Sequence, residues 1–415
     1  MTPNAEAFLN SLFRAAVAAA DPAVAVPKFL PEKPTGRVVV VGAGKASAKM
    51  AQAVEAVWGP CEGIVIVPYG AALPTEGIEI VEARHPVPDA SGQAAAARIL
   101  DLVSGLGEGD LALCLISGGG SALLAAPGEG LTLEDKQAVN KALLSCGAAI
   151  DEMNCLRKHL SRIKGGRLTV AAWPARCVTL TISDVPGDDP AIIASGPTVP
   201  DPTTASDARE IAARYHLDLS DAVAAYLQTP AAETPDPTHP AFAAAECHMI
   251  ATPQMALDAA AEVARAEGVA PLILGDALEG EAAELGIVLA GVARAALTHG
   301  HPIKGPAVIL SGGETTVTVR GSYGKGGRNS ECLLSFGLHA PEEVSALSCD
   351  TDGIDGSEDN AGVIWVPRVA AHKAEARPYL EGHDAYSFFE KAGGLVVSGP
   401  THTNVNDFRA IYIPG

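Results

Sequence analysis

The sequence predicts an α/β protein with two domains: a Rossmann-like, three-layer N-terminal domain with a mostly parallel sheet, and a smaller, mixed-sheet α/β C-terminal domain. In the first half, the strand-like runs are continuous apolar stretches, which is typical of parallel strands buried on both faces. Helical segments separate these runs, as βαβ units require. A segment rich in Pro, Thr and Asp, residues 229–242, then indicates a linker. We therefore expect domains at 1–240 and 241–415.

The same patterns predict the individual elements. Continuous apolar runs predict strands of the first domain at 37–42, 63–68, 78–83, 111–117 and 177–183. Helices are expected from the turn after the first strand to about 57, near 91–105, and over 132–148 and 151–163. In the second domain, strands at 247–251, 270–274, 344–353 and 408–414 and a hairpin-like piece at 306–319 alternate with helices to about 267, around 280–299 and from 328. This mixture indicates a mixed second sheet.

Composition and charge narrow the class of protein. The net charge of −20 would repel a polyanion, so nucleic acid is not expected as a partner. The sequence suggests no apolar run long enough to span a membrane, and the N-terminus lacks the basic start of a secretory signal. The eight cysteines are scattered without a CxxC pair, which indicates reduced thiols of a cytoplasmic protein and no zinc motif.

The stretch VVVVGAGKASAKM, residues 38–50, reads as a buried strand, a glycine turn and a helix. It is not a Walker loop, because Ala46 follows the lysine, and Ser47 replaces the third glycine of a dinucleotide fingerprint. Two interpretations remain open. The turn could be an ordinary one with Lys45 in solvent, or Lys45 could be a point charge for a phosphate or carboxylate at the carboxyl edge of the sheet.

Two further segments of the first domain point to an anionic ligand. Three consecutive glycines, Gly118, Gly119 and Gly120, follow a buried strand, flanked by Ser117 and Ser121; they favour close approach of phosphates to the backbone, with a flexible bend as the alternative. The segment 154–168 concentrates positive charge. Most of its cations are expected on the surface, and one or two could face the ligand. These cations are Arg157, Lys158, Arg162, Lys164 and Arg167.

Acidic residues cluster after the strand at 177–183 and again in the second domain. Carboxylates beside a phosphate pocket can hold Mg²⁺, and one could accept a hydroxyl proton, although turn formation is an alternative role. The candidates are Asp184, Asp188, Asp189 and Asp352. In the second domain, Arg328 at a helix start could clamp a carboxylate, and SGGE at 311–314 echoes the triple-glycine loop.

These motifs together resemble the class II, MOFRL-type glycerate 2-kinase family almost from end to end. The segments that carry the resemblance are GAGKAS, HPVPD, SGGGSALL, RKHLSRIKGGRL, SDVPGDDPAIIASGPT, SGGETTVTV, GKGGRNSE, DTDGIDG and TNVND. The resemblance implies ATP- and Mg²⁺-dependent phosphorylation of D-glycerate at its 2-hydroxyl, in an interdomain cleft. It also implies Lys45 and Arg328 as the active-site pair.

Residue roles follow from the residues and the resemblance together. Catalysis is assigned to Lys45, Arg328 and Asp189. Contacts with D-glycerate are assigned to Lys45, Ser47, Arg328, Asn329, Thr403 and Asn404. ATP is assigned to Ser117, Gly118, Gly119, Gly120, Ser121, Gly312, Gly313 and Glu314, and Mg²⁺ to Asp184, Asp188, Asp189 and Asp352. A homodimer stays an open expectation, and no membrane or nucleic-acid partner is expected.

The chain departs from the family pattern at two positions. His402 stands where the family usually has glycine, and Ser330 stands where it often has Gln. Two rival functions are also weighed: an NAD(P)H-dependent hydroxypyruvate reductase, and a non-catalytic sensor of sugar acids or nucleotides. The reductase is disfavoured because Ser47 interrupts the fingerprint and no clear ribose-binding acid follows in GIVIVPYG.

Overall fold

The computed structural model describes residues 4–319, 321 and 323–415. The chain divides into two compact units, each with its own sheet. The first, called the Rossmann unit, is Pro22–Ile250. The second, called the mixed-sheet unit, is Ala251–Gly415 together with the N-terminal segment that ends at Asp21.

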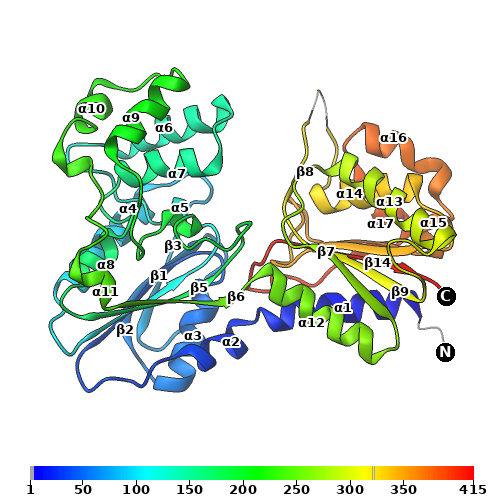
Figure 1. The fold of residues 1–415 in the computed structure, drawn as a ribbon, viewed down its shortest axis with the longest axis horizontal. Helices are drawn as coiled ribbons and strands as arrows, with labels where there is room; N and C mark the ends of the chain where they lie inside the picture. The colour runs from blue at the N-terminus through cyan, green and yellow to red at the C-terminus, as the bar shows by residue number, and fades with distance from the viewer. Residues whose placement is uncertain (1–3, 320, 322) are drawn as a thin grey trace. The chain divides into compact units, whose positions relative to one another are not determined.

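The Rossmann unit is built on a six-stranded sheet of order β3-β2-β1-β4-β5-β6 (Figure 1). The pairs β3–β2, β2–β1, β1–β4 and β4–β5 are parallel, which confirms the α/β class predicted from the continuous apolar runs. This is the strand order of a doubly wound fold, in which ligands bind where the order reverses, between β1 and β4. The strands are β1 (Val38–Ala43), β2 (Glu62–Pro68), β3 (Ile78–Ala83), β4 (Leu111–Ile116), β5 (Arg176–Ile182) and β6 (Ala245–Ala251).

Helices cover both faces of this sheet, with α3 on one face and α4 on the other (Figure 1). A second group of helices packs around its own core, which includes Leu143, Leu156 and Ile211, and stands beyond the carboxyl end of the strands. The helices are α2 (Pro22–Phe29), α3 (Ser47–Trp58), α4 (Ala90–Ser104), α5 (Gly120–Leu123), α6 (Leu133–Cys146), α7 (Ile150–His159), α8 (Arg167–Ala172), α9 (Ala205–Arg214), α10 (Asp221–Tyr226) and α11 (Pro240–Ala243), with 3₁₀ turns η1 (Ile193–Ser195) and η2 (Pro230–Ala232).

The mixed-sheet unit has a six-stranded sheet of order β13-β12-β11-β14-β9-β7, in which only β7 and β9 pair in parallel. This confirms the predicted mixed sheet. Helices α1 and α12 lie on one face, and α13, α14 and α17 lie on the other (Figure 1). The strands are β7 (Ala270–Gly275), β8 (Gly280–Glu281), β9 (Ala307–Ser311), β10 (Thr315–Thr316), β11 (Ser345–Asp350), β12 (Gly362–Trp365), β13 (Leu395–Val396) and β14 (Asp407–Ile413). The helices are α1 (Ala5–Ala19), α12 (Pro253–Ala266), α13 (Ala282–His299), α14 (Arg328–His339), α15 (Pro367–Ala370), η3 (Lys373–Glu375), α16 (Ala376–Glu381) and α17 (Ala385–Ala392).

The structure differs from the predicted organisation in three places. The strand predicted at 247–251 is β6 of the Rossmann sheet rather than the start of the second domain. Helix α1, assigned by its position to the first domain, packs on α12 and β14, where Phe8 meets Tyr412 at 5.6 Å between ring centroids. The predicted hairpin at 306–319 does not form, because β9 pairs with β14 and β7 while β10 pairs with β8.

Two helical segments of the described chain, Ala5–Phe29 and Ala282–His299, are long and apolar enough to cross a membrane by length and composition. In both, part of the apolar surface is covered within the protein: 44% of the apolar stretch in the first and 33% of that in the second are buried. Leu9, Leu12 and Phe13 of α1 are buried, and α13 packs along α14. Core helices of globular proteins pass the same test, so this finding is weak support for membrane insertion.

We expect Gly286→Ala to lower the free energy of unfolding by about 1–3 kcal/mol, because overpacking a tight helix–helix contact is destabilising. An added Cβ at Gly286 of α13 would lie 2.3 Å from the carbonyl oxygen of Cys332 on α14. The matched control is Gly291→Ala in the same helix, where no heavy atom lies within 4 Å; it should gain roughly 0.5–1 kcal/mol from helix propensity. Chemical denaturation measures both, and a G286A variant as stable as G291A would contradict the packing.

Candidate active site

The loop between β1 and α3 lies at the switch point of the Rossmann sheet, and its amides are already occupied. The amide of Lys45 donates to the carbonyl of Gly118 at 2.9 Å, and that of Ala46 to Ser117 Oγ at 3.1 Å. The amides of Gly44 and Ser47 donate to the carbonyls of Ile66 and of Gly44. A dinucleotide pyrophosphate needs these donors at a helix N-terminus. The loop is therefore a rigid support for Lys45 rather than a phosphate cradle of the dinucleotide type.

Two serines, Ser47 and Ser117, hold this loop to the next one, while their predicted contacts with ligands stay predictions. Ser47 Oγ donates to the carbonyl of Leu115 at 3.0 Å and lies 3.1 Å from Ser117 Oγ. Both side chains are fully buried. Their role in the structure is to join the ends of β1 and β4, which fixes where the backbone of Lys45 sits.

Each glycine of the triple-glycine loop is required by its surroundings. An added Cβ would lie 1.7 Å from Asp184 Oδ2 at Gly118 and 2.9 Å from the carbonyl oxygen of Ala43 at Gly120. Gly119 has φ +82°, a left-handed conformation that glycine adopts without cost. At Gly119 the added atom would lie 3.1 Å from the His85 ring and 3.6 Å from Lys45 Cγ. A flexible bend does not account for this packing, since the loop is tightly enclosed by Lys45, His85 and Asp184.

The three predicted acidic residues after β5 lie in different settings. Asp184 lies against the triple-glycine loop. Asp188 sits in a turn with φ 54°. The exposed Asp189 accepts the amide of Ala191 at 2.8 Å, which is a turn-forming contact. Within the described residues, no group of three or more His, Cys, Asp or Glu side chains could by itself hold a metal ion.

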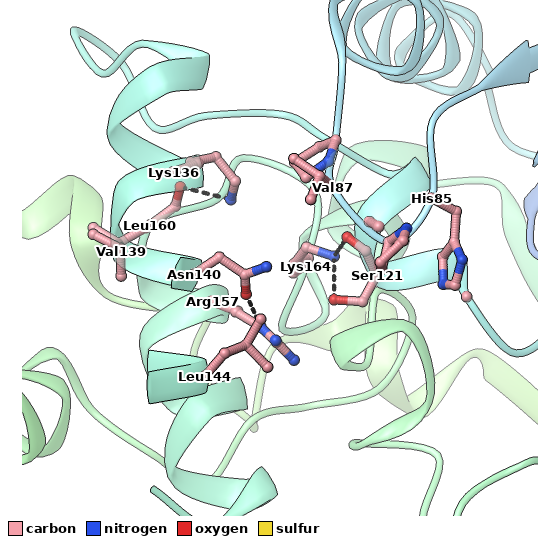
Figure 2. Close-up of a pocket in the computed structure, with 14 residues that line it drawn as sticks. His85, Val87, Ser121, Lys136, Val139, Asn140, Leu144, Arg157, Leu160 and Lys164 are labelled. Atoms are coloured by element: carbon pink, nitrogen blue, oxygen red, sulfur yellow. Dashed lines mark hydrogen bonds between the residues drawn. The ribbon is translucent and has the colours of Figure 1, made fainter. Parts of the chain in front are cut away.

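A cavity of about 210 Å³ opens beside the triple-glycine loop, within the Rossmann unit. Ser121 and His85 lie on one side, and side chains of α6 and α7 lie on the other (Figure 2). Gly119 also lines the cavity. Three cations face it: Lys136 from α6, Arg157 from α7, and Lys164 from the turn after α7. We call this space the cationic cavity.

Hydrogen bonds to neutral oxygens hold the three cations in place. Lys164 Nζ donates to the carbonyls of Ser121 at 2.8 Å and Ala194 at 3.3 Å, and its side chain is buried. Lys136 Nζ donates to the carbonyl of Leu160 at 3.2 Å, and Arg157 Nε donates to Asn140 Oδ1 at 2.9 Å. Burial lowers the pKa of Lys136 to about 7, with repulsion from Arg157 adding to the effect. Burial likewise lowers the pKa of Lys164 well below its usual range.

The rest of the basic segment 154–168 serves the fold. Lys158 forms a buried ion pair with Asp201 at 3.1 Å. Arg167 donates to the carbonyls of residues 158 and 231–233, and the exposed Arg162 donates to the carbonyl of Pro127. Of the five cations predicted from the sequence, Arg157 and Lys164 line the cavity, in agreement with the expectation that one or two would face a ligand site.

Arg328, at the start of α14 in the mixed-sheet unit, is held by three carboxylates. Its Nε, Nη1 and Nη2 atoms lie 2.9 Å from Asp407, 2.7 Å from Glu314 and 2.8 Å from Asp350, respectively. Burial alone would lower the pKa of Arg328, but these carboxylates raise it above its usual value. The guanidinium is therefore permanently charged and fixed in direction, and only the half-exposed Glu314 is a partner that solvent reaches easily.

The residues around Arg328 form a buried hydrogen-bond network. Asn329 donates to Asp407 Oδ1 at 2.7 Å and accepts from Ser348 Oγ at 2.6 Å, so it supports the network around Arg328. Its predicted contact with substrate stays a prediction. Asp355 caps α14 by accepting the amides of Asn329 and Ser330. Ser330 Oγ also donates to Asp355 at 2.5 Å, which explains how serine serves where the family often has Gln.

The other residues predicted in this unit are accounted for by local structure. An added Cβ on Gly313, at φ +99°, would lie 2.2 Å from the amide nitrogen of Leu278, and the Gly312 carbonyl accepts Arg409. The buried Thr403 donates to the carbonyl of Ala20 at the end of α1. Asn404 accepts the amide of Asn406, and Asp352 accepts that of Ile354. Their predicted roles toward ATP, D-glycerate and Mg²⁺ stay predictions.

The structure thus brings together Lys45, Gly118–Gly120 and Asp184 at one sheet edge, and Arg328 with Glu314 and Asn329 in the other unit. Sequence reasoning missed Lys136, which lies outside every recognised motif and joins the cavity only through the packing of α6. It also missed His85, although that residue opens the HPVPD motif. A polar residue at the start of a recognised motif was the available signal.

Comparison with known proteins agrees with this geometry. Residues 8–228 match the model of a domain of unknown function, DUF4147, and residues 307–407 match the MOFRL family. The chain is 40% identical over 406 residues to the D-glycerate 2-kinase of Thermotoga maritima, covering 95% of both chains. The chain belongs to the MOFRL-type glycerate 2-kinase family.

Other relatives carry two kinds of name. The human glycerate kinase is 33% identical, with 97% of this chain and 92% of the human chain covered. A protein of Agrobacterium vitis, provisionally named a hydroxypyruvate reductase, is 54% identical, with 99% and 95% covered. The crystal structure of the Thermotoga maritima glycerate kinase matches with a TM-score of 0.88 at 39% identity, covering 97% of this chain and 98% of the other.

We expect His402→Gly to leave the free energy of unfolding unchanged or to raise it by up to about 1 kcal/mol. His402 has φ 57°, a left-handed conformation that is strained for residues with a Cβ, so glycine relieves strain while adding freedom to the unfolded chain. The control is His372→Gly, at φ −94°, which should lose roughly 0.5–1 kcal/mol. Equal losses for both variants in chemical denaturation would contradict this account.

We expect Lys136→Met to stabilise the fold near pH 6 by roughly 1–3 kcal/mol, allowing for the partial exposure of this lysine. The native pKa of about 7 lies below the ordinary 10.5, so the unfolded chain binds more protons between these values. Wild-type stability therefore rises with pH across this window, and the advantage of K136M shrinks toward pH 10. The control, Lys141→Met on the exposed face of α6, should change stability little at either pH. A pH-independent gain in K136M would contradict the titration.

Proposed function

We propose that this protein is an ATP-dependent kinase that phosphorylates D-glycerate on its 2-hydroxyl group, giving 2-phosphoglycerate and ADP. The observation that carries the proposal is the fixed position of Lys45 beside the triple-glycine loop at the sheet's switch point. Phosphoryl transfer needs mainly positioning and charge neutralisation, and a cation held next to a glycine-rich turn supplies both. The names of the relatives from Thermotoga maritima and human support the same reaction.

In this reaction, Lys45 orients the transferring phosphoryl group or the glycerate carboxylate by its charge. The backbone of residues 118–120 lies against Lys45 and receives the ATP phosphates at close range, because no Cβ atoms intervene. Arg328 is pre-oriented by Asp350 and Asp407 and engages the glycerate carboxylate by exchanging its contact with Glu314. Because Lys45 and Arg328 belong to different units, their joint action on one substrate remains a prediction.

Mg²⁺ fits the residues beside the triple-glycine loop. The Asp184 carboxylate lies against Gly118, and Mg²⁺ is usually bound through one or two carboxylates together with phosphate oxygens and water. When bound, Mg²⁺ neutralises charge on the phosphates of ATP. Asp184 is better placed than Asp189 to accept the proton of the 2-hydroxyl, since its carboxylate lies against Gly118 of the loop proposed to receive the phosphates. Asp189, Asp188 and Asp352 stay predicted ligands or bases.

A hydroxypyruvate reductase is the second candidate, supported by the name of the Agrobacterium vitis relative. The geometry favours it less. The amides that would bind a dinucleotide pyrophosphate are engaged within the protein, and β2 ends at Pro68, followed by Tyr69 and Gly70, neither of which offers a carboxylate for the ribose. We further propose that the enzyme acts in the cytoplasm on small molecules, with no nucleic acid or membrane as partner.

We expect Lys45→Ala to lower kcat for ADP formation with D-glycerate by about 10²-fold or more, because one preorganised charge at the transferring group is removed. The backbone bonds of residue 45 do not depend on its side chain, so the fold should persist, as circular dichroism would check. The control is Lys28→Ala, at an exposed lysine at the end of α2, which should keep full activity. Phosphorus NMR of the product identifies the phosphorylated hydroxyl.

The same assay separates the rival functions. Oxidation of NADH or NADPH with hydroxypyruvate, without ADP formation from ATP and D-glycerate, would overturn the kinase proposal in favour of the reductase. Tight binding of ATP and three-carbon acids without turnover would instead indicate a sensor. Near-normal kinase activity of K45A would remove Lys45 from the mechanism.

A further inference from the structure

The cationic cavity concentrates positive charge that the described residues around it do not neutralise with carboxylates. Within the described part of the chain, no carboxylate oxygen lies within 4.0 Å of the side-chain nitrogens of Lys136, Arg157 or Lys164; their partners are carbonyl, hydroxyl and amide oxygens. In the same segment, the fold pairs the buried Lys158 with a carboxylate, Asp201. Arg162 and Arg167 of this segment also have carbonyl partners in place of a carboxylate, but they do not line the cavity. What distinguishes the cavity is that three cations without a counter-ion among the described residues face one space, in a protein of net charge −20.

This arrangement is unfavourable for folding by itself. Buried charges are normally paired, and like charges that share a site raise each other's energy. The lowered pKa values of Lys136 and Lys164 reflect that cost. A leucine or methionine at position 136 of α6 would avoid this electrostatic cost. Buried charges that destabilise the fold are concentrated at functional sites, where a ligand supplies the missing opposite charge.

The number of cations and the shape of the cavity identify the class of ligand. A three-carbon acid has one carboxylate and would neutralise one of the three cations, whereas the tail of a nucleoside triphosphate carries several charges along its length. The cavity continues into a second hollow of about 610 Å³, because both are lined by Val87, Pro88, Asn140 and Leu144. These mostly apolar walls suit the flat ring of a base more than a small polar acid.

The cavity also leads to the proposed site of transfer. Gly119 lines it, and the same residue is enclosed by Lys45 and His85. Ser121, two residues further along, accepts hydrogen bonds from Lys164 on its carbonyl and its hydroxyl and faces the cavity (Figure 2). A chain of phosphates that starts at Arg157 and Lys136 would pass Lys164 and reach the triple-glycine loop beside Lys45.

We propose that the cationic cavity binds the polyphosphate tail of the nucleoside triphosphate, with Lys136, Arg157 and Lys164 as its charge partners. The base of the nucleotide then lies against the apolar side chains shared by the two hollows, Val87, Pro88 and Leu144. The proposal rests on the kinase function proposed above and adds residues to it. It places nucleotide recognition within the Rossmann unit, on helices α6 and α7 as well as on the triple-glycine loop.

The test is titration calorimetry of the full chain with ATP and, separately, with inorganic tripolyphosphate. Wild type is compared with Lys136→Met and Arg157→Met, which keep side-chain bulk and remove charge. Lys164 is left intact, because its buried bonds to Ser121 and Ala194 support the fold. We expect each variant to weaken both ligands at least tenfold, as loss of one charged contact implies. The matched control, Arg162→Met, removes an exposed cation of the same segment and should change affinity less than twofold.

Three outcomes decide the proposal. Weakening of ATP and tripolyphosphate together in K136M and R157M supports it. Unchanged binding of both, or a rise in the KM for D-glycerate without a change for ATP, overturns it, the latter by assigning the cavity to the acid. Failure of the kinase function is recognised separately: if wild type makes no ADP with D-glycerate but tripolyphosphate binds and weakens in the variants, the cavity assignment stands without that reaction.

Discussion

The hydrogen bonds that join the loops after β1 and β4 are the constraint on which the Rossmann unit depends. The amide of Lys45 donates to the carbonyl of Gly118, and Ser47 Oγ contacts Ser117 Oγ and donates to the carbonyl of Leu115. These bonds join the ends of β1 and β4 at the point where the sheet reverses its strand order. These hydrogen bonds occupy the backbone amides that the pyrophosphate of a dinucleotide would need. They leave a lysine, a glycine loop and a carboxylate in fixed relation, which suits transfer of a phosphoryl group more than transfer of hydride.

In the mixed-sheet unit, side-chain carboxylates rather than backbone hydrogen bonds hold the cation in place. Its arginine is held by three carboxylates, and Asn329, Arg409 and Asp355 hold those carboxylates or the helix beneath them. A guanidinium held by three carboxylates is fixed in one orientation, so the proposed exchange of Glu314 for a ligand would need little reorganisation. In the Rossmann unit, Lys136, Arg157 and Lys164 are held by neutral oxygens, whereas in the mixed-sheet unit Arg328 is held by three carboxylates.

The sequence predicted the class of both sheets and the outline of the site, because buried parallel strands and glycine turns leave local signatures. Gly118 and Lys45 were found this way. What depends on distant packing was not predicted: β6 and α1 were assigned to the wrong units, and Lys136 was missed, since only the fold of α6 against α7 turns it toward the cavity. Motifs also do not show which polar atoms are used inside the protein: Asn329 and Ser117 are buried and form internal hydrogen bonds, while their assigned contacts with ligands stay predictions.

The pairing of the first helix with the last strand has a consequence during synthesis. Residues 22–250 contain a whole sheet and its covering helices, so they can fold while the ribosome is still translating the remainder. Helix α1 emerges earlier, yet Phe8 and Phe13 find their aromatic partners Tyr412 and Phe408 only when β14 has left the exit tunnel. For most of translation, helix α1 therefore exposes apolar side chains that have not yet packed on β14. Transiently exposed apolar surface of this kind is what chaperones protect in a nascent chain.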